Sequence, residues 1–176
     1  MALSKIDAAN FLTGTIPQGN VANASLGAVT SLPAAIATGK VLQVVQASDT
    51  TSRTTTSSSY ATLSSVLTVN ITPASTSNKI LVVLSVGGMG ADASGTNSKC
   101  TVYRGSTDIS PGSGLGFGDN NVNASHYYSG AGGCVLDSPN STSQQTYQFY
   151  MKSSDGNTAR MNNGSISTLT CYEIKG

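Results

Sequence analysis

The clearest alternation of apolar and polar residues lies in residues 60–88, which predict two strands joined by a polar turn. In the first strand, Leu67, Val69 and Ile71 fall on one face, with the period of two that a strand requires. In the second, residues 80–86 are apolar at nearly every position and rich in β-branched side chains. Such a run predicts a central strand that is covered on both faces. We therefore expect this pair to form the core.

Shorter strands are predicted around this pair, separated by turns rich in Gly, Ser, Asn and Pro. They cover residues 39–47, 99–104, 132–137, 146–152, 158–162 and 165–175. No segment has a helical period, and we expect no helix longer than one turn. Strands of this number and length predict an all-β fold over residues 39–176, an antiparallel β-sandwich of the jelly-roll type.

Three segments between the strands are predicted to be loops: residues 49–59, which are polar, and residues 87–98 and 110–133, which are rich in glycine. A loop as long as the last one is uncommon in a compact domain unless it has a function. It combines Tyr, Asn and Gly, the composition of recognition surfaces. The candidate receptor-contact residues in it are Asp119, Asn120, Asn121, His126, Tyr127 and Tyr128. For His126 and the two tyrosines, a sugar-stacking or pH-sensitive patch and a contact within a trimer remain alternatives.

Residues 1–38 differ from the rest, because a large apolar residue recurs there at every fifth position from Ile6 to Ile36, except at Ser31. Each is preceded by a small residue two positions earlier, as in Ala9 before Phe11 and Gly14 before Ile16. This step is typical of a pentapeptide coil, a solenoid in which one unit cannot bury its own apolar edge and about three must stack. One short arm cannot complete such a core, so we expect three copies to share it. The expected trimer core of the arm is Ile6, Phe11, Ile16, Val21 and Leu26.

The alternative interpretation of residues 1–38 is a flexible Gly/Ala/Thr linker with accidental spacing. Pro17 and Pro33 are compatible with either interpretation and exclude a continuous helix.

The low content of charged residues argues against two kinds of partner, nucleic acids and membranes. Only 10 % of the residues are charged and the formal net charge is +1, against about 25 % charged residues in an average soluble domain. Without a Lys/Arg cluster we expect no nucleic acid partner. The longest apolar run is far shorter than the roughly 20 residues that cross a bilayer, so no membrane insertion is expected. The N-terminus also lacks the basic and apolar segments of a signal peptide.

The residues that carry chemistry are scattered along the chain. The cysteines Cys100, Cys134 and Cys171 are widely spaced, which predicts buried free thiols rather than a disulfide framework or a zinc site. Single Asp residues beside Gly, Ser or Asn are predicted to cap turns. With one histidine and no GxSxG motif, we expect no catalytic residues, no metal and no cofactor.

The order of several segments resembles a known family. The C-terminal module of fibre-like virion proteins of tailed phages is similar to VLQVVQA, LTVNITPASTSNKILVVLSVGG, VYRGSTDI, LDSPNSTSQQTYQFYMKSSDGN and TCYEIKG, and fibre shafts are similar to LTGTIPQGNVANASLGAVTSLPAAI. The resemblance implies a homotrimer with an outward β-sandwich head and a shaft or anchor at the N-terminus. It also implies a role in host contact or particle decoration, and no enzyme activity.

Fibres of this family usually begin with a long tail-attachment domain, whereas this sequence starts at Met1 almost directly in the arm. We therefore expect a short fibre or decoration protein on the capsid, neck or tail. It would be assembled in the host cytoplasm and bound through residues 1–38 to other virion proteins. A glycan or protein of the host surface is the candidate partner of the head, residues 39–176. The competing classes are a cellular carbohydrate-binding module or adhesin fragment and, further behind, a polysaccharide depolymerase.

Overall fold

Two antiparallel β-sheets make up the part of the chain that the computed structural model describes, residues 40–92, 95–110, 118–121 and 127–176. No helix occurs within these residues. Sheet A contains β1 (Val41–Asp49), β2 (Arg53–Thr55), β4 (Lys79–Ala91), β8 (Tyr127–Asp137), β10 (Ala159–Met161) and β11 (Ser167–Ile174). Sheet B contains β3 (Thr68–Ile71), β5 (Asn97–Arg104), β6 (Thr107–Asp108), β7 (Gly118–Asn121) and β9 (Gln145–Ser153). The all-β class and the antiparallel sheets predicted from the sequence are confirmed.

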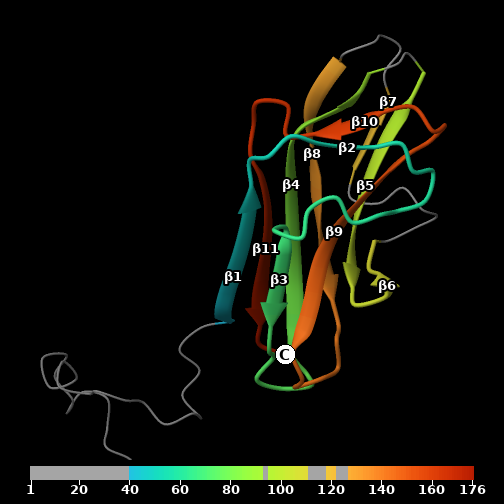
Figure 1. Ribbon diagram of the computed structural model, residues 1–176. Helices are drawn as coiled ribbons and strands as arrows, with labels where there is room; N and C mark the ends of the chain where they lie inside the picture. The colour runs from blue at the N-terminus through green and yellow to red at the C-terminus, as the bar shows by residue number, and fades with distance from the viewer. Residues whose placement is uncertain (1–39, 93–94, 111–117, 122–126) are drawn as a thin grey trace, which may run out of the picture. The chain divides into compact units, whose positions relative to one another are not determined.

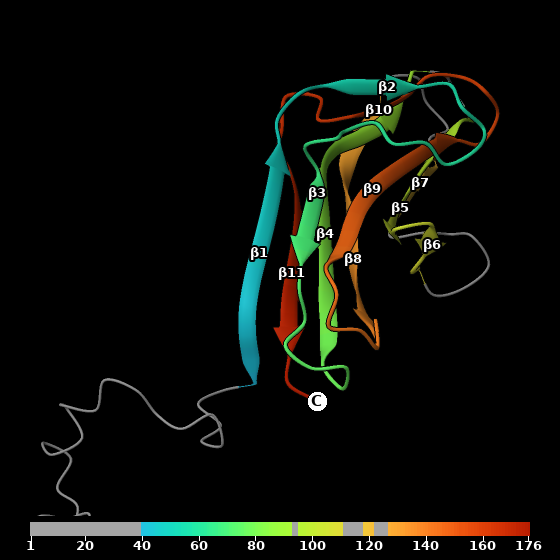
Figure 2. The same cartoon turned by 60° about the horizontal axis from the view of Figure 1, so that its bottom comes forward.

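Strands that are far apart in the chain lie side by side (Figure 1). In sheet A, β1 pairs with β11, β11 with β4, and β4 with β8. The short β10 extends the β11 side of β4 and pairs in turn with β2, and both run across the top of the view in Figure 2. In sheet B, β3 pairs with β9 and β9 with β5, while β7 and β6 pair with the other edge of β5.

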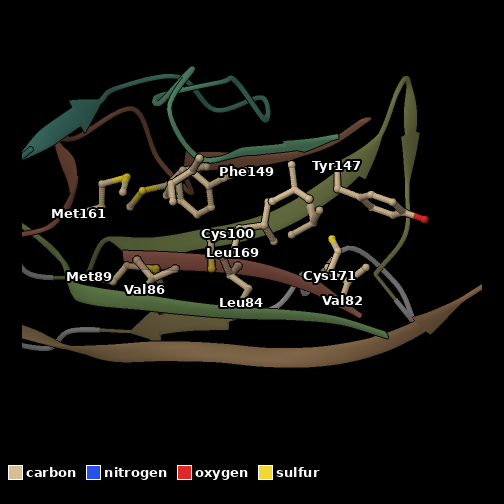
Figure 3. Close-up of a cluster of buried hydrophobic side chains, with 14 of the residues drawn as sticks. Val82, Leu84, Val86, Met89, Cys100, Tyr147, Phe149, Met161, Leu169 and Cys171 are labelled. Atoms are coloured by element: carbon tan, nitrogen blue, oxygen red, sulfur yellow. The ribbon is translucent and has the colours of Figure 1, made fainter. Parts of the chain in front are cut away.

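The core lies between the two sheets. Along β4 the inward side chains are Ile80, Val82, Leu84 and Val86, each no more than 2 % exposed. Sheet B contributes the fully buried Tyr147, Phe149 and Met151 of β9, together with Cys100 and Val102 of β5. Figure 3 shows side chains of both sheets gathered in this layer. Since burying one such side chain stabilises the fold by roughly 1.5–3 kcal/mol, this layer is the main source of stability.

Both strands predicted for residues 60–88 are found, and they do not pair with each other. Leu67, Val69 and Ile71 are buried as expected, yet β3 belongs to sheet B and β4 to sheet A. The two apolar strand faces therefore meet across the core instead of side by side in one sheet. This arrangement buries both faces at once, as sandwich packing requires.

The predicted first strand is also shorter than expected, because the chain turns at Ser64. The buried Ser64 hydroxyl donates to Asp49 Oδ2 (2.5 Å) and accepts from the backbone N–H of Leu67 (3.1 Å). Such a local side-chain hydrogen bond competes with strand pairing. Regular structure in this segment consequently begins at Thr68.

The predicted position of β4 in the middle of its sheet is confirmed, but its coverage on both faces is wrong. Leu81 and Val83, whose side chains point away from the core, are only partly buried, and Ser85 is exposed. Sheet A is thus packed on one face, and its outer face carries apolar side chains.

Residues 87–98, predicted as a loop, mostly continue β4 and begin β5. Two glycines allow this, because the chain passes very close to residues 163–166 there. A Cβ at Gly88, where φ is +51°, would lie 2.8 Å from the backbone nitrogen of Asn163, and one at Gly87 would lie 2.4 Å from the Ile166 carbonyl oxygen. The register of β4 against β8 also shifts between Val86 and Met89. The glycines therefore form a bulge within a strand.

All the predicted strands are found, and three short strands were missed. β2 lies in the predicted polar loop of residues 49–59, β6 follows β5 after a tight turn, and β7 lies in the predicted loop of residues 110–133. None of the three has an apolar alternation, so backbone pairing alone defines them. Residues 1–39, with Ile6, Phe11, Ile16, Val21 and Leu26, lie outside the described residues, and the five-residue step stays a prediction.

Replacing Phe149 by Ala should lower the free energy of unfolding by about 3–5 kcal/mol, because the large cavity left between the sheets cannot be filled by neighbours. The control is Val66→Ala, whose side chain is 51 % exposed and whose loss should change stability by no more than about 0.5 kcal/mol. Urea unfolding followed by tyrosine fluorescence measures both. Equal effects of the two substitutions would contradict the core described above.

Candidate functional site

The residues predicted to contact a receptor lie in two strands rather than in a loop. Asp119, Asn120 and Asn121 form most of β7, and Tyr127 and Tyr128 begin β8. His126 lies outside the described residues. The long loop expected at residues 110–133 is therefore wrong in its second half, because main-chain pairing with β5 and β4 orders strands that carry no apolar pattern.

The strand register brings the backbones of these residues to one end of the sandwich. Asn121 is opposite Asn97, the first residue of β5, and Tyr127 is opposite Ala91, the last residue of β4. Since β4 leads into β5 at this end, the end of β7 and the start of β8 lie there too, one in each sheet. The sequence grouped these positions by composition and gave no reason for their pairing, and their role as a receptor contact stays a prediction.

The backbone of β7 also extends sheet B at the edge of β5. Asp119 occupies the position opposite Lys99 of β5, and Lys99 is opposite Lys152 of β9. Both lysines alternate with buried neighbours, so their side chains lie on the outer face. The next outward position on β9 is Tyr150, which is opposite Thr101 of β5, and Tyr103 is the outward position after Thr101.

A tyrosine cluster, made by Tyr60, Tyr103 and Tyr150, covers this outer face. The rings of Tyr103 and Tyr150 have centroids 4.3 Å apart at 38°, and Tyr60 meets Tyr103 edge-on at 6.4 Å and 64°. The Lys152 ammonium lies 4.5 Å from the centre of the Tyr60 ring. Aromatic pairs and cation–π contacts of this kind each contribute about 0.5–1.5 kcal/mol. The cluster joins three segments that are distant in sequence.

Asp108 supports the tyrosine cluster from β6. Its Oδ1 accepts hydrogen bonds from the Thr101 hydroxyl (2.6 Å), the Ser110 hydroxyl (2.7 Å) and the Ser110 backbone N–H (3.0 Å). Burial raises the pKa of Tyr103, and the negative charge of Asp108 and the neighbouring Tyr150 act in the same direction. The Tyr103 hydroxyl is therefore neutral at physiological pH and able to donate a hydrogen bond.

The sequence analysis missed this cluster. The alternation in β9 places Tyr150 and Lys152 on the face of the strand that does not carry Tyr147 and Phe149. This was the only sign in the sequence that Tyr150 lies on the outer face. The partners from residues 60 and 103 could not be found, because they depend on the pairing of β5 with β9 and on the path of the chain before β3.

Two buried carboxylates, Asp49 and Glu173, lie at opposite ends of the paired strands β1 and β11 and accept hydrogen bonds from neighbouring segments. At one end, Asp49 accepts hydrogen bonds from Thr51 N–H (2.8 Å) and Arg53 Nε (2.7 Å) as well as from Ser64. Burial acts to raise its pKa, but the hydrogen bonds from Ser64, Arg53 and Thr51 outweigh it and lower the pKa of Asp49 to about 2. The charged form is therefore the native form.

At the opposite end, Glu173 is only 1 % exposed and is held by three donors. Its carboxylate accepts from Asn78 Nδ2 (2.5 Å), Gln43 Nε2 (2.6 Å) and the Ala74 backbone N–H (2.7 Å). Burial acts against the charge, and these three hydrogen bonds outweigh it, so that the pKa of Glu173 is lowered. A buried charge is tolerated when its oxygens are fully hydrogen-bonded.

The other acids whose side chains are described also have structural partners. Asp137 Oδ2 accepts from Arg104 (2.8 Å) and from the Tyr147 hydroxyl (2.7 Å), and Asp92 pairs with Arg160 (2.7 Å). Turn capping, as predicted, is confirmed where the carboxylate accepts the backbone N–H two residues later. It occurs at Asp49, Asp108 and Asp155.

The cysteines are free, as predicted, but only two are buried. Cys100 and Cys171 lie in the core, and burial raises the pKa of Cys171 to about 12, with Asp137 acting in the same direction. Cys134 is exposed on the outer face of sheet A, which corrects the expectation of a third buried thiol. The reason is the alternation of β8, where the neighbouring Val135 takes the position toward the core.

Within the described residues, no three His, Cys, Asp or Glu side chains are close enough to hold a metal ion. In the same residues no helix is long and apolar enough to cross a membrane. No protein-family model matches the sequence, and no curated protein is similar enough to count as a relative.

Acid should destabilise the fold through Asp49. The pKa of Asp49 is about 2 in the folded protein, lowered from 3.8. The charged carboxylate therefore adds to the free energy of unfolding above about pH 4. This stabilisation, about 2 kcal/mol, is lost as the pH falls toward 2. Urea unfolding at steps between pH 5 and pH 2 measures this loss. The variant Asp49→Asn should lose correspondingly less over that range, since it keeps the other acids and removes only this titration. Parallel curves for the two proteins would contradict the assignment.

Proposed function

We propose that this protein is a non-enzymatic virion structural protein of a bacteriophage, a short trimeric fibre or decoration protein on the capsid, neck or tail. The observation that carries the proposal is the combination of a five-residue apolar step in residues 1–38 with an antiparallel two-sheet domain behind it. Residues 1–38 would need further copies of the arm to bury their apolar residues, and the two-sheet domain has outer faces that could contact a partner.

The head is proposed to be a jelly roll. Its eight main strands, in chain order, are β1, β3, β4, β5, β7, β8, β9 and β11. The first pairs with the eighth, the second with the seventh, the third with the sixth and the fourth with the fifth. A long hairpin rolled into two four-stranded sheets has these pairings, and virion proteins commonly use such a domain.

The arm, residues 1–38, is proposed to join three copies and to dock on other virion proteins. Sharing Ile6, Phe11, Ile16, Val21 and Leu26 around one axis would remove apolar surface that a single arm leaves in water. At roughly 25 cal/mol per Å² of buried apolar surface, a few such side chains per chain offset the entropy of ordering the arm.

Host contact is proposed for the part of the head that includes β7 and the start of β8. The outer face of sheet B, which β7 joins at its edge, offers the tyrosine cluster, Lys99 and Lys152. Rings beside hydrogen-bonding groups suit a neutral or weakly acidic polar ligand such as a surface glycan. The same cluster supports the alternative, a cellular carbohydrate-binding module or adhesin fragment. A glycan-array hit combined with absence of the protein from any particle would favour that alternative.

The arm is tested by replacing Phe11, Ile16 and Val21 together by Ser in the full chain. The wild-type protein should have the mass of a trimer in sedimentation equilibrium, and the triple variant should dissociate toward monomers at low micromolar concentration, because it lacks apolar side chains worth roughly 1.5–3 kcal/mol each when buried. The matched control replaces the preceding polar residues, Asn10, Thr15 and Asn20, by Ser and should remain trimeric. A monomeric wild type, or a triple variant that assembles normally, would overturn the trimer.

Host contact is tested by replacing Tyr127 and Tyr128 by Ala. Particles carrying the double variant should assemble normally but adsorb to host cells at least about tenfold less, since aromatic anchors contribute about 2 kcal/mol or more to an interface. Particles with Val66→Ala, a change at an exposed position before β3, should adsorb like the wild type. Unchanged adsorption of the double variant would count against this contact.

A further inference from the structure

The outer face of sheet A carries an apolar row that crosses four strands. The register aligns one outward residue from each of β1, β11, β4 and β8, in the order Val44, Tyr172, Leu81 and Leu136. The outermost two are more than half exposed, Val44 at 54 % and Leu136 at 56 %. The next row toward the β2–β10 end contains Gln46, Thr170, Val83 and Cys134. We call these two rows the apolar face.

The apolar face carries no charge at any of its described positions, nor does the third row, which contains Ser48, Thr168, Ser85 and Gly132. Cations occur only beyond these rows: Lys79 at the start of β4 donates a hydrogen bond to Ser138 (2.7 Å), and Lys40, which is exposed, directly precedes β1. An open face of an antiparallel sheet is normally polar. Contiguous apolar surface of this kind marks an interaction site.

The edge strand next to the apolar face is unprotected as well. β1 is nine residues long, lies at the edge of sheet A, and exposes Val41 (51 %) and Leu42 (45 %) besides Val44. Edge strands of soluble proteins usually carry charges, Pro or bulges that prevent pairing with other chains. β1 has one register irregularity, between Val41 and Gln43, and no charged residue before Asp49.

Two observations favour another copy of this chain as the occupant. First, an uncharged face offers nothing for a charged partner to complement, and copies with a net charge of +1 do not repel one another appreciably. Second, residue 38 ends the arm only three residues before Val41. A shared arm would therefore hold the start of β1 of every copy within roughly 10 Å of the arm's end.

We propose that the apolar face, together with the first residues of β1, is the surface through which the heads of neighbouring copies meet. This inference rests on the proposed self-assembly and specifies which surface of the head it uses. Side chains that are half exposed in one chain become buried between copies. The outer face of sheet B then points away from the contact and stays available to a partner.

The exposed thiol of Cys134 reports directly on this contact. Cys134 is part of the apolar face, whereas Cys100 and Cys171 are buried in the core and serve as internal references. The full chain is treated with N-ethylmaleimide, and modification of each cysteine is followed by peptide mass spectrometry. In the assembled protein, Cys134 should react at least about tenfold more slowly than in the unfolded chain, because the heads must separate first.

The matched variants are Val44→Gln with Leu136→Gln on the apolar face, and Val66→Gln, an equally exposed valine elsewhere (51 %). Glutamine is neutral, so the charge around the thiol is unchanged. The double variant should restore fast modification of Cys134, and the control should not. The unfolding midpoint of each variant verifies that it is folded, and the wild-type rate tests the proposal even if the double variant fails to fold.

The outcomes separate this inference from the proposed function. A trimeric wild type whose Cys134 reacts as fast as in the unfolded chain overturns the head contact and leaves the arm-based trimer intact. Slow modification that persists in the double variant also overturns it, since the protection then has another source. A monomeric wild type with a fast Cys134 overturns both proposals. Slow modification that the double variant relieves supports the head contact.

Discussion

The apolar layer buried between the two sheets, to which β4 and β9 both contribute, is the interaction on which the rest of the fold depends. Val82 and Leu84 on one side and Tyr147 and Phe149 on the other are fully or almost fully buried. Every other main strand extends these two through its backbone pairing: β11 and β8 flank β4, while β3 and β5 flank β9. The same packing determines which side chains form the outer faces, because every second side chain of a strand points away from the core.

In a chain with so few charges, two buried acids stabilise the ends of the sandwich. Asp49 accepts hydrogen bonds from residues 51–64, and Glu173 accepts hydrogen bonds from residues 74–78 at the other end. These hydrogen bonds attach the two segments to the sheets. Each carboxylate replaces water with polar groups of the protein, so its charge is retained inside the structure. The sequence offered no sign of this, since Glu173 lies within an apolar alternation and its donors come from distant segments.

The sequence predicted the fold class and every strand that has an apolar face, because burial enforces an alternation that can be recognised locally. It could not predict β2, β6 and β7, which are held by backbone hydrogen bonds and have no side-chain signature. It predicted β3 and β4 as two strands joined by a turn, but adjacency in the chain did not reveal that they join different sheets. For the candidate site, the positions in β7 and β8 were identified from composition, whereas the tyrosine cluster required strand register. The exposure of Cys134 followed from the alternation of β8, which the cysteine spacing alone did not indicate.

The two outer faces of the head differ in chemistry, and connectivity explains why they would differ in role. Residues 1–38 precede β1 in the chain, and β1 is the edge strand of sheet A, so the proposed contact between heads uses the sheet that directly follows them in sequence. The apolar, uncharged outer face of sheet A suits that contact. Sheet B has no direct link to the arm, and its outer face carries Lys99, Lys152 and the tyrosine cluster. A binding surface is useful only where a partner can reach it, and in this arrangement the polar and aromatic face is the one left outside.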